Sequence, residues 1–180
     1  MRRRLVIALI FFLSAWLISI LQLSFLDSLP GVWSQINLVF LALSFVLFFL
    51  DLNNALVFAL MLGLFLDFFS FNPFGFNLSL ALLSVLVLNL LLVNWLTNRS
   101  FYSLVVLSAV AIVVSRILGA LILMFASAWG PDKAVFVFLH WFWWRQMLWQ
   151  VLASFVLTLL FFNLMNMLSY RLKPFFLAKK

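Results

Sequence analysis

The sequence has no cysteine and no glutamate, and its 180 residues include a single histidine and only four aspartates. The absence of cysteine excludes disulfide bonds, thiolate metal sites and cysteine nucleophiles. Metal sites and proton-transfer sites usually need several carboxylates or imidazoles that converge, and only Asp67 falls well within an apolar run. We therefore expect no enzyme activity, no cofactor and no metal site.

Charged residues are scarce as well. They make up 8% of the chain, whereas apolar residues make up 68%. A soluble domain usually has about a quarter charged residues and about half apolar ones, and intrinsic disorder requires low hydrophobicity. The composition excludes both classes and predicts an integral membrane protein. The net charge of +7 is then expected to report membrane topology rather than a nucleic-acid partner.

The apolar residues come in continuous runs of about 20, the length of a helix that crosses a hydrocarbon core of roughly 30 Å, and they do not alternate with period two as in a barrel strand. We expect an all-α, polytopic membrane protein with six short-looped transmembrane helices in one domain, residues 1–180. The predicted spans lie near residues 5–26, 32–50, 55–71, 78–96, 104–126 and 149–168.

Two of these segments need comment. The first span follows three arginines and has no small-residue cleavage site after it, which is typical of an uncleaved signal anchor. Residues 134–145, before the last span, are crowded with aromatic rings, which prefer the headgroup level. They are interpreted as an interfacial or re-entrant piece, and a single long tilted helix is the alternative.

The distribution of Lys and Arg predicts the orientation. With six spans and a cytoplasmic N-terminus, eight of the 11 cations lie on the cytoplasmic side, Lys133 lies outside, and Arg116 and Arg145 fall within apolar runs. Both termini are therefore expected in the cytoplasm, where the basic tail also suits anionic membrane lipids. The eight inner cations are Arg2, Arg3, Arg4, Arg99, Arg171, Lys173, Lys179 and Lys180.

Charges inside the spans call for an explanation, because an Asp or Arg at the bilayer centre costs at least about 2.5–3.5 kcal/mol. Asp67 and Arg116 both accompany small residues at every fourth position, a spacing that lets helix backbones approach closely in lipid. The two small-residue stripes are Ala55, Ala59, Gly63 and Asp67 in the third span, and Ala111, Ser115 and Gly119 in the fifth span.

Three interpretations of these charges stay open. In the first, both stripes pack within the chain, and Asp67 pairs with an arginine or caps the outer loop. In the second, the charges mark an interface with a partner's transmembrane helix. In the third, they belong to a proton or ion relay. A relay usually shows several intramembrane carboxylates or histidines, which disfavours the third. We expect Asp67 and Arg116 to lie close together.

Residues 63–77, with the sequence GLFLDFFSFNPFGFN, resemble the most recognisable stretch of the bacterial rod-shape-determining membrane protein family MreD. In that family a glycine-bearing helix runs into a Leu-Asp pair, and a short loop leads to a hydrophobic residue and a glycine before the next helix. Leu66-Asp67 and Phe74-Gly75 match this pattern. The family often has Pro followed by Asn or Asp at the entry to the second span, where this chain has Ile36-Asn37.

The resemblance implies a non-enzymatic scaffold of cell elongation in the bacterial cytoplasmic (inner) membrane, which links cytoplasmic MreB filaments to peptidoglycan synthesis. The implied partners are a bitopic MreC-like protein, a RodA-type glycosyltransferase and its penicillin-binding transpeptidase. By position, the resemblance points first to Gly63, Asp67 and Gly75. The full set of candidate structural or partner-interaction residues is Gly63, Asp67, Pro73, Gly75, Arg116, Gly119 and Arg145.

A second hypothesis is a small-molecule-binding membrane subunit of an energy-coupling-factor-type transporter, which also has about six short-looped helices and no catalytic groups. A binding pocket would gather polar residues near the outer face. The candidates for such a pocket are His140, Arg145, Gln146 and Gln150. A third class, a lipid-modifying transferase, is disfavoured by the lack of glutamate and the single histidine.

Overall fold

The structure, a computed structural model, describes residues 2–30, 34, 36–96, 101–128 and 141–176. These residues form helices and their connections, without a strand among them. The elements are α1 (Arg2–Ile20) with its π-helical continuation η1 (Leu21–Leu26), α2 (Leu38–Phe49), α3 (Leu52–Phe69), α4 (Phe76–Asn94), α5 (Phe101–Ala128) and α6 (Trp141–Phe176).

Four helical stretches of the described chain are long and apolar enough to cross a membrane: Leu9–Leu26, Leu52–Phe69, Phe76–Asn94 and Tyr102–Phe125. Each coincides, within a few residues, with one of the predicted spans. Backbone groups in lipid must find partners within their own segment, and a helix provides them. The prediction of a helical membrane protein is therefore confirmed for the helical class and for four stretches of the length and composition that a span requires.

The predicted span at residues 32–50 corresponds to a shorter helix. Helix α2 has 12 residues, about 18 Å at 1.5 Å per residue, which is less than the hydrocarbon thickness. The Asn37 side chain accepts a hydrogen bond from the Phe40 backbone N–H at 3.4 Å and so caps the start of the helix. Residues 31–33 and 35 lie outside the described residues.

Helix α6 contains the predicted span at residues 149–168 and extends it in both directions. Trp141–Arg145 form the beginning of this helix and continue into it without a break. The described part of residues 134–145 therefore agrees with the single long helix and not with a separate interfacial piece. Residues 134–140 lie outside the described residues.

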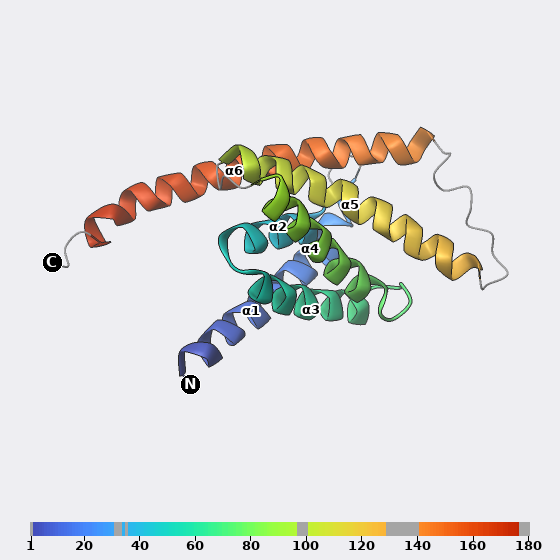
Figure 1. Cartoon of the computed structure of the whole chain (residues 1–180), viewed down its shortest axis with the longest axis horizontal. Coiled ribbons are helices and arrows are strands. Elements are labelled where there is room, and N and C mark those ends of the chain that lie inside the picture. The colour runs from blue at the N-terminus through green and yellow to red at the C-terminus, as the bar shows by residue number, and fades with distance from the viewer. Residues whose placement is uncertain (1, 31–33, 35, 97–100, 129–140, 177–180) are drawn as a thin grey trace.

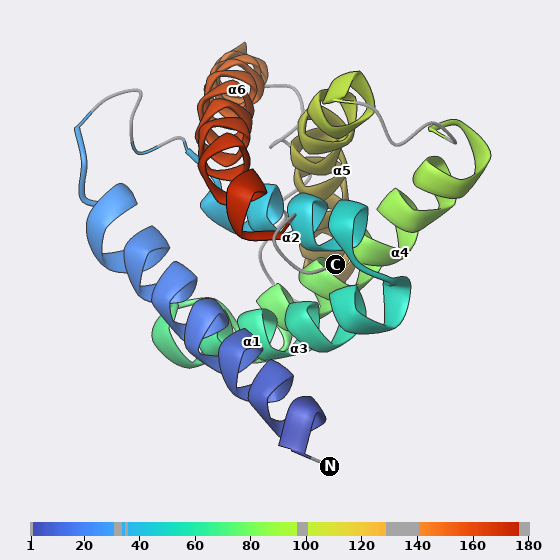
Figure 2. The same ribbon diagram turned by 90° about the vertical axis from the view of Figure 1, so that its left-hand side faces the viewer.

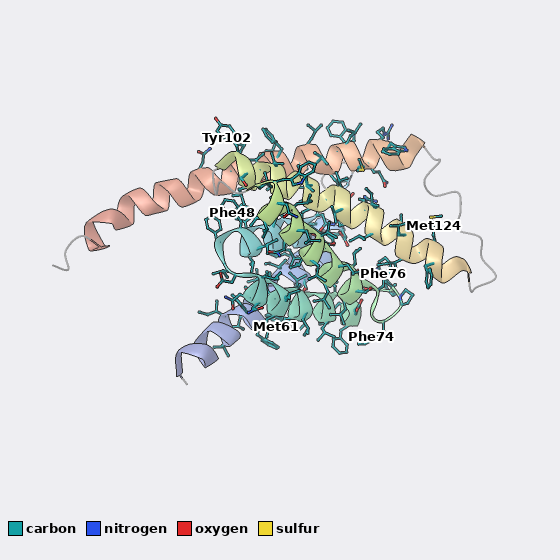
Figure 3. The ribbon with its side chains drawn as sticks, viewed as in Figure 1. Phe48, Met61, Phe74, Phe76, Tyr102 and Met124 are labelled. Atoms are coloured by element: carbon teal, nitrogen blue, oxygen red, sulfur yellow. The ribbon has the colours of Figure 1, made fainter. Side chains whose placement is uncertain are left out.

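The helices run back and forth along the long axis of the molecule (Figure 1). The α3–α4 turn lies toward the right of this view, and the α2–α3 connection lies toward the left, as do the first residues of α1 and the last turns of α6. Figure 3 shows the same division, with Phe74 and Met124 toward one end and Phe48 and Tyr102 toward the other. Neighbouring helices are thus mostly antiparallel, as short loops require.

The interior is formed chiefly by α2, α3, α4 and α5, and α2 packs against the other three. In Figure 2, α1 and α4 lie on opposite sides of α2 and α3, while α5 and α6 run alongside each other. From Leu9 to Ile20, helix α1 exposes most of its apolar side chains, including Leu9, Phe12 and Leu17. Such a surface suits contact with lipid. Large side chains that are fully buried are Leu43, Leu47, Phe58, Leu62, Val85, Leu88, Leu104, Leu107 and Ile112.

Candidate functional site

The Asp67 carboxylate holds the beginning of α4. Its Oδ2 accepts hydrogen bonds from the backbone N–H groups of Gly75 at 2.9 Å and Leu78 at 3.2 Å, and its Oδ1 accepts one from Asn77 at 2.8 Å. The first N–H groups of a helix have no partner within the helix, and a negative charge is favourable at this positive end of the helix dipole. Asp67, although it is 95% buried, is therefore fully provided with hydrogen-bond donors.

The turn between α3 and α4 has a backbone shape that brings these N–H groups together. Gly75 has φ +90° and ψ −9°, the values of the third residue of a type II turn, and the Phe76 N–H donates to the Pro73 carbonyl at 3.0 Å. The Asn77 side chain donates to the Ser70 hydroxyl at 2.8 Å. We call Asp67, Ser70, the turn and the start of α4 the Asp67 corner.

Gly63 brings α3 and α4 into direct backbone contact beneath this corner. A Cβ atom at Gly63 would lie 2.7 Å from the Leu78 Cα atom, closer than any side chain tolerates. At Gly119 a Cβ would lie 3.7 Å from the side chain of Leu80, an ordinary contact. The small-residue stripes of α3 and α5 are buried within the chain, which agrees with their interpretation as intramolecular packing.

Arg116 has a different partner from the one expected. Its Nε donates to the Gln150 Oε1 at 2.8 Å, which joins α5 to α6. Among the described residues, no hydrogen bond or ion pair joins Arg116 to Asp67. Of the two roles left open for Asp67 within the chain, an arginine partner and a cap of the loop, the structure shows the cap, because the backbone N–H groups of the next helix take up the carboxylate.

Gln22, in η1, connects the end of the first helix to the start of α2. Its Nε2 donates to the Asp27 Oδ1 at 2.9 Å and to the Ile36 carbonyl at 3.1 Å, and its Oε1 accepts from the Leu38 N–H at 2.9 Å. The amide thus links η1 to the first turn of α2, and Gln22 is buried. Short π-helical segments such as η1 frequently occur at functional sites.

A cavity of about 280 Å³ lies between these groups. Its walls come from η1, the start of α2, the Asp67 corner, α5 and α6, so that Gln22 and Gln150, far apart in the chain, face the same space. The polar residues that line it are Gln22, Asp27, Ser34, Asn37, Ser70, Asn72, Asn77, Arg116 and Gln150. We call this space the polar cavity; apolar residues, among them Leu66 and Leu80, complete its walls.

The sequence candidates are divided between the corner and the cavity. Asp67, Pro73 and Gly75 belong to the Asp67 corner, Gly63 lies beneath it, and Arg116 lines the polar cavity. Gly119 lies on α5 against α4.

The polar cavity contains one described residue of the outer polar set that was named for a possible pocket. Gln150 lines the cavity, but the exposed Arg145 and the half-buried Gln146 are not among the residues lining it. His140 lies outside the described residues.

Several residues of the cavity were not among the sequence candidates, namely Gln22, Asp27, Asn37, Ser70 and Asn77. Gln22 carries a signal, since it is the single amide side chain in the predicted span 5–26, and polar groups inside a span usually have a partner. Asp27 directly follows that span, where the sequence predicts a loop. Their convergence depends on helix packing and leaves no pattern in the sequence.

A second polar contact holds α5 and α6 together. The hydroxyl oxygens of Ser108 and Thr158 lie 3.0 Å apart, and both side chains are fully buried. Hydroxyl pairs of this kind join transmembrane helices without a hydrophobic driving force. This contact lies on the same pair of helices as Arg116 and Gln150 and fixes the register in which those two side chains meet.

The chemistry available to the polar cavity is that of hydrogen bonding and of one cation. Within the described part of the chain, no group of three or more His, Cys, Asp or Glu side chains gathers where a metal ion would bind. The groups that face the cavity are amides, hydroxyls, the Arg116 guanidinium and the Asp27 carboxylate.

No protein-family model, curated protein or solved structure matches the chain.

Proposed function

We propose that this protein is a non-enzymatic scaffold of the MreD type in the cell-elongation machinery of a bacterium. In this role it lies in the cytoplasmic membrane with both termini in the cytoplasm. It links cytoplasmic MreB filaments and an MreC-like bitopic protein to peptidoglycan synthesis by a RodA-type glycosyltransferase and its transpeptidase.

The observation that carries the proposal is the Asp67 corner. The family resemblance is strongest between residues 63 and 77, and in this stretch Gly63, Asp67 and Gly75 act in one structural unit. Asp67 binds the N–H groups eight to eleven residues further on, and Gly75 provides the turn that presents them. The spacing between Asp67 and Gly75, which is part of the resemblance, therefore has a physical reason in this chain: it brings the N–H groups of the turn within reach of the carboxylate.

The arrangement of the helix ends supports the proposed orientation. The start of α1, the end of α6 and the α2–α3 connection lie toward one end of the molecule, opposite the α3–α4 turn (Figure 1). Most of the lysines and arginines lie near the two termini in the sequence, that is, toward the end of the molecule with the start of α1 and the end of α6. Cytoplasmic segments of membrane proteins are enriched in Lys and Arg. The Asp67 corner then faces the outer side of the membrane.

The role is tested by affinity purification of the tagged full-length chain from its own host in mild detergent. A scaffold of this type is expected to recover an MreC-like bitopic protein, identified by mass spectrometry. Gly63→Ala, which forces α3 and α4 apart, is expected to reduce the recovery, and Gly119→Ala, for which there is space, serves as the matched control. Recovery of no such partner with the wild-type chain contradicts the proposal.

The polar cavity favours a second candidate function, a small-molecule-binding subunit of an energy-coupling-factor-type transporter. Binding sites in membrane bundles lie between helices, with a few convergent polar groups, and the cavity has this character. The same purification separates the two candidates, because a transporter subunit is expected to recover ATPase subunits in place of a bitopic partner.

A further inference from the structure

Arg116 places a positive charge well inside an apolar span, and its hydrogen-bond partner is neutral. It lies on the span Tyr102–Phe125, nine residues before the end of that span and so about 13 Å from it along the helix. Charged groups at this depth usually pair with an opposite charge or with several hydrogen-bonding groups. Within the described residues, Arg116 bonds to the Gln150 amide oxygen and forms no ion pair with a carboxylate.

The geometry of that hydrogen bond leaves the end of the guanidinium available. Gln150 accepts from Nε, so the two terminal Nη groups are not engaged by it, and Arg116 lines the polar cavity. A guanidinium offers its N–H groups in a planar fork that binds carboxylate or phosphate through two parallel hydrogen bonds. Gln150 is itself 93% buried, and it holds the Nε side of the guanidinium in place.

The remaining walls of the cavity suit a small polar ligand. Asn72 and Asn77 line it from the Asp67 corner, so the cavity extends from the α3–α4 turn down to Arg116 in the middle of α5. Its volume of about 280 Å³ is near the lower end of ligand pockets. The one carboxylate among the residues lining it, Asp27, accepts a hydrogen bond from Gln22.

We propose that the polar cavity binds an oxyanion, a carboxylate or a phosphate, through the terminal N–H groups of Arg116. A small molecule that enters from the side of the α3–α4 turn and the headgroup of an anionic lipid both carry this chemistry. The inference goes beyond the scaffold role and does not depend on partner recovery, since it concerns a property of the isolated chain.

The test measures thermal unfolding by the fluorescence of the eight tryptophans, with the full-length chain in lipid nanodiscs. In phosphatidylcholine nanodiscs, inorganic phosphate is titrated at constant ionic strength with sodium chloride as the balancing salt. In a second arm, phosphatidylglycerol replaces part of the phosphatidylcholine and no phosphate is added. A ligand that binds the folded state raises the melting temperature, so a rise in the first arm identifies a free anion and a rise in the second alone identifies a headgroup.

Four variants connect the response to the cavity. Arg116→Gln is expected to abolish the rise, and Arg116→Lys to weaken the apparent affinity by about tenfold, because an ammonium loses the planar fork. Asp27→Asn is expected to strengthen binding, since it removes the competing negative charge. Arg145→Gln, which removes an exposed cation outside the cavity, serves as the control and is expected to respond like the wild type.

The outcomes separate a binding role from a structural one. If Arg116 serves only to hold α6, then Arg116→Gln melts below the wild type without any anion, and the wild type responds in neither arm. A wild type that responds in neither arm, or an Arg116→Gln variant that responds like the wild type, overturns the proposal. If Arg116→Gln does not fold, an unchanged affinity in both Arg116→Lys and Asp27→Asn overturns it.

Discussion

Asp67 and Arg116, the two charged residues that fall within the predicted spans, are held in opposite ways. Asp67 is almost fully buried and accepts three backbone hydrogen bonds from a segment that follows it closely in the chain. Arg116 is half-buried, bonds to one neutral amide on the following helix, 34 residues further along the chain, and faces a polar cavity.

The two residues show that a charge buried within a helix bundle can serve either the stability of the fold or the binding of a ligand. A carboxylate whose oxygens are taken up by backbone N–H groups is a structural element, because its removal leaves those donors without a partner. A cation with a single neutral partner keeps hydrogen-bonding capacity for a ligand. We therefore assign stability to the Asp67 corner and recognition to the polar cavity.

The largest effect is expected for Asp67→Ala. This change leaves three N–H groups of the α4 start without their acceptor and is expected to lower the free energy of unfolding by about 3 kcal/mol. Asp67→Asn keeps one carbonyl oxygen and is expected to lose about half as much. The measurement is unfolding in mixed detergent micelles, and equal stability of Asp67→Ala and the wild type contradicts the structural assignment.

Gly63→Ala is expected to have the next largest effect. Its new methyl group would lie 2.7 Å from the Leu78 Cα atom, so the backbones of α3 and α4 must separate, at a loss of about 2 kcal/mol. The matched variant Gly119→Ala meets only side-chain atoms at 3.7 Å or more and should stay within about 0.5 kcal/mol of the wild type. If both variants lose stability equally in the same unfolding assay, the close approach at Gly63 is not special.

Gly75→Ala tests the turn that presents the N–H groups to Asp67. Its φ of +90° is unfavourable for a residue with a Cβ atom, and the expected loss is about 1 kcal/mol. Gly75→Asn should lose less, because asparagine adopts positive φ more readily than alanine does. The order of melting temperatures, wild type above Asn above Ala, is the measurement, and an Ala variant that melts above the Asn variant would show that space rather than φ limits this position.

The smallest expected effect is the coupling free energy between Asp67 and Arg116. Because Asp67 and Arg116 share no hydrogen-bond partner, the stability changes of Asp67→Asn and Arg116→Gln are expected to add within about 0.5 kcal/mol in the double variant. The double-mutant cycle uses the same unfolding assay. A coupling well above this value would show that the two side chains interact, and it would remove the contrast between corner and cavity.

Part of the fold could be predicted from local features of the sequence. Continuous apolar runs place the helices because the bilayer allows no unpaired backbone, and four of these runs correspond to Leu9–Leu26, Leu52–Phe69, Phe76–Asn94 and Tyr102–Phe125. The run at residues 32–50 yields only the 12 residues of α2. An apolar run does not show whether a segment meets lipid or the interior of its own bundle, and α2 is mostly buried by other helices.

The candidate site could be predicted only in part, for a related reason. The sequence singled out Asp67 and left its partner open between an arginine and a loop cap; the donors that hold it are eight to eleven residues away, and backbone N–H groups have no side-chain signature. The polar cavity combines residues as far apart as Gln22 and Gln150. Their meeting depends on how the helices pack.

Local features of the sequence predict a membrane environment, the helical class and two charges that need a partner, because the free energy of transfer into lipid and the need to pair backbone groups apply to each segment separately. The partners of these charges follow from the packing of the helices: the start of α4 binds Asp67, and Gln150 binds Arg116 beside the polar cavity. Side-chain partners depend on the register and crossing of packed helices, and in lipid that packing follows from the shape of small residues rather than from hydrophobicity.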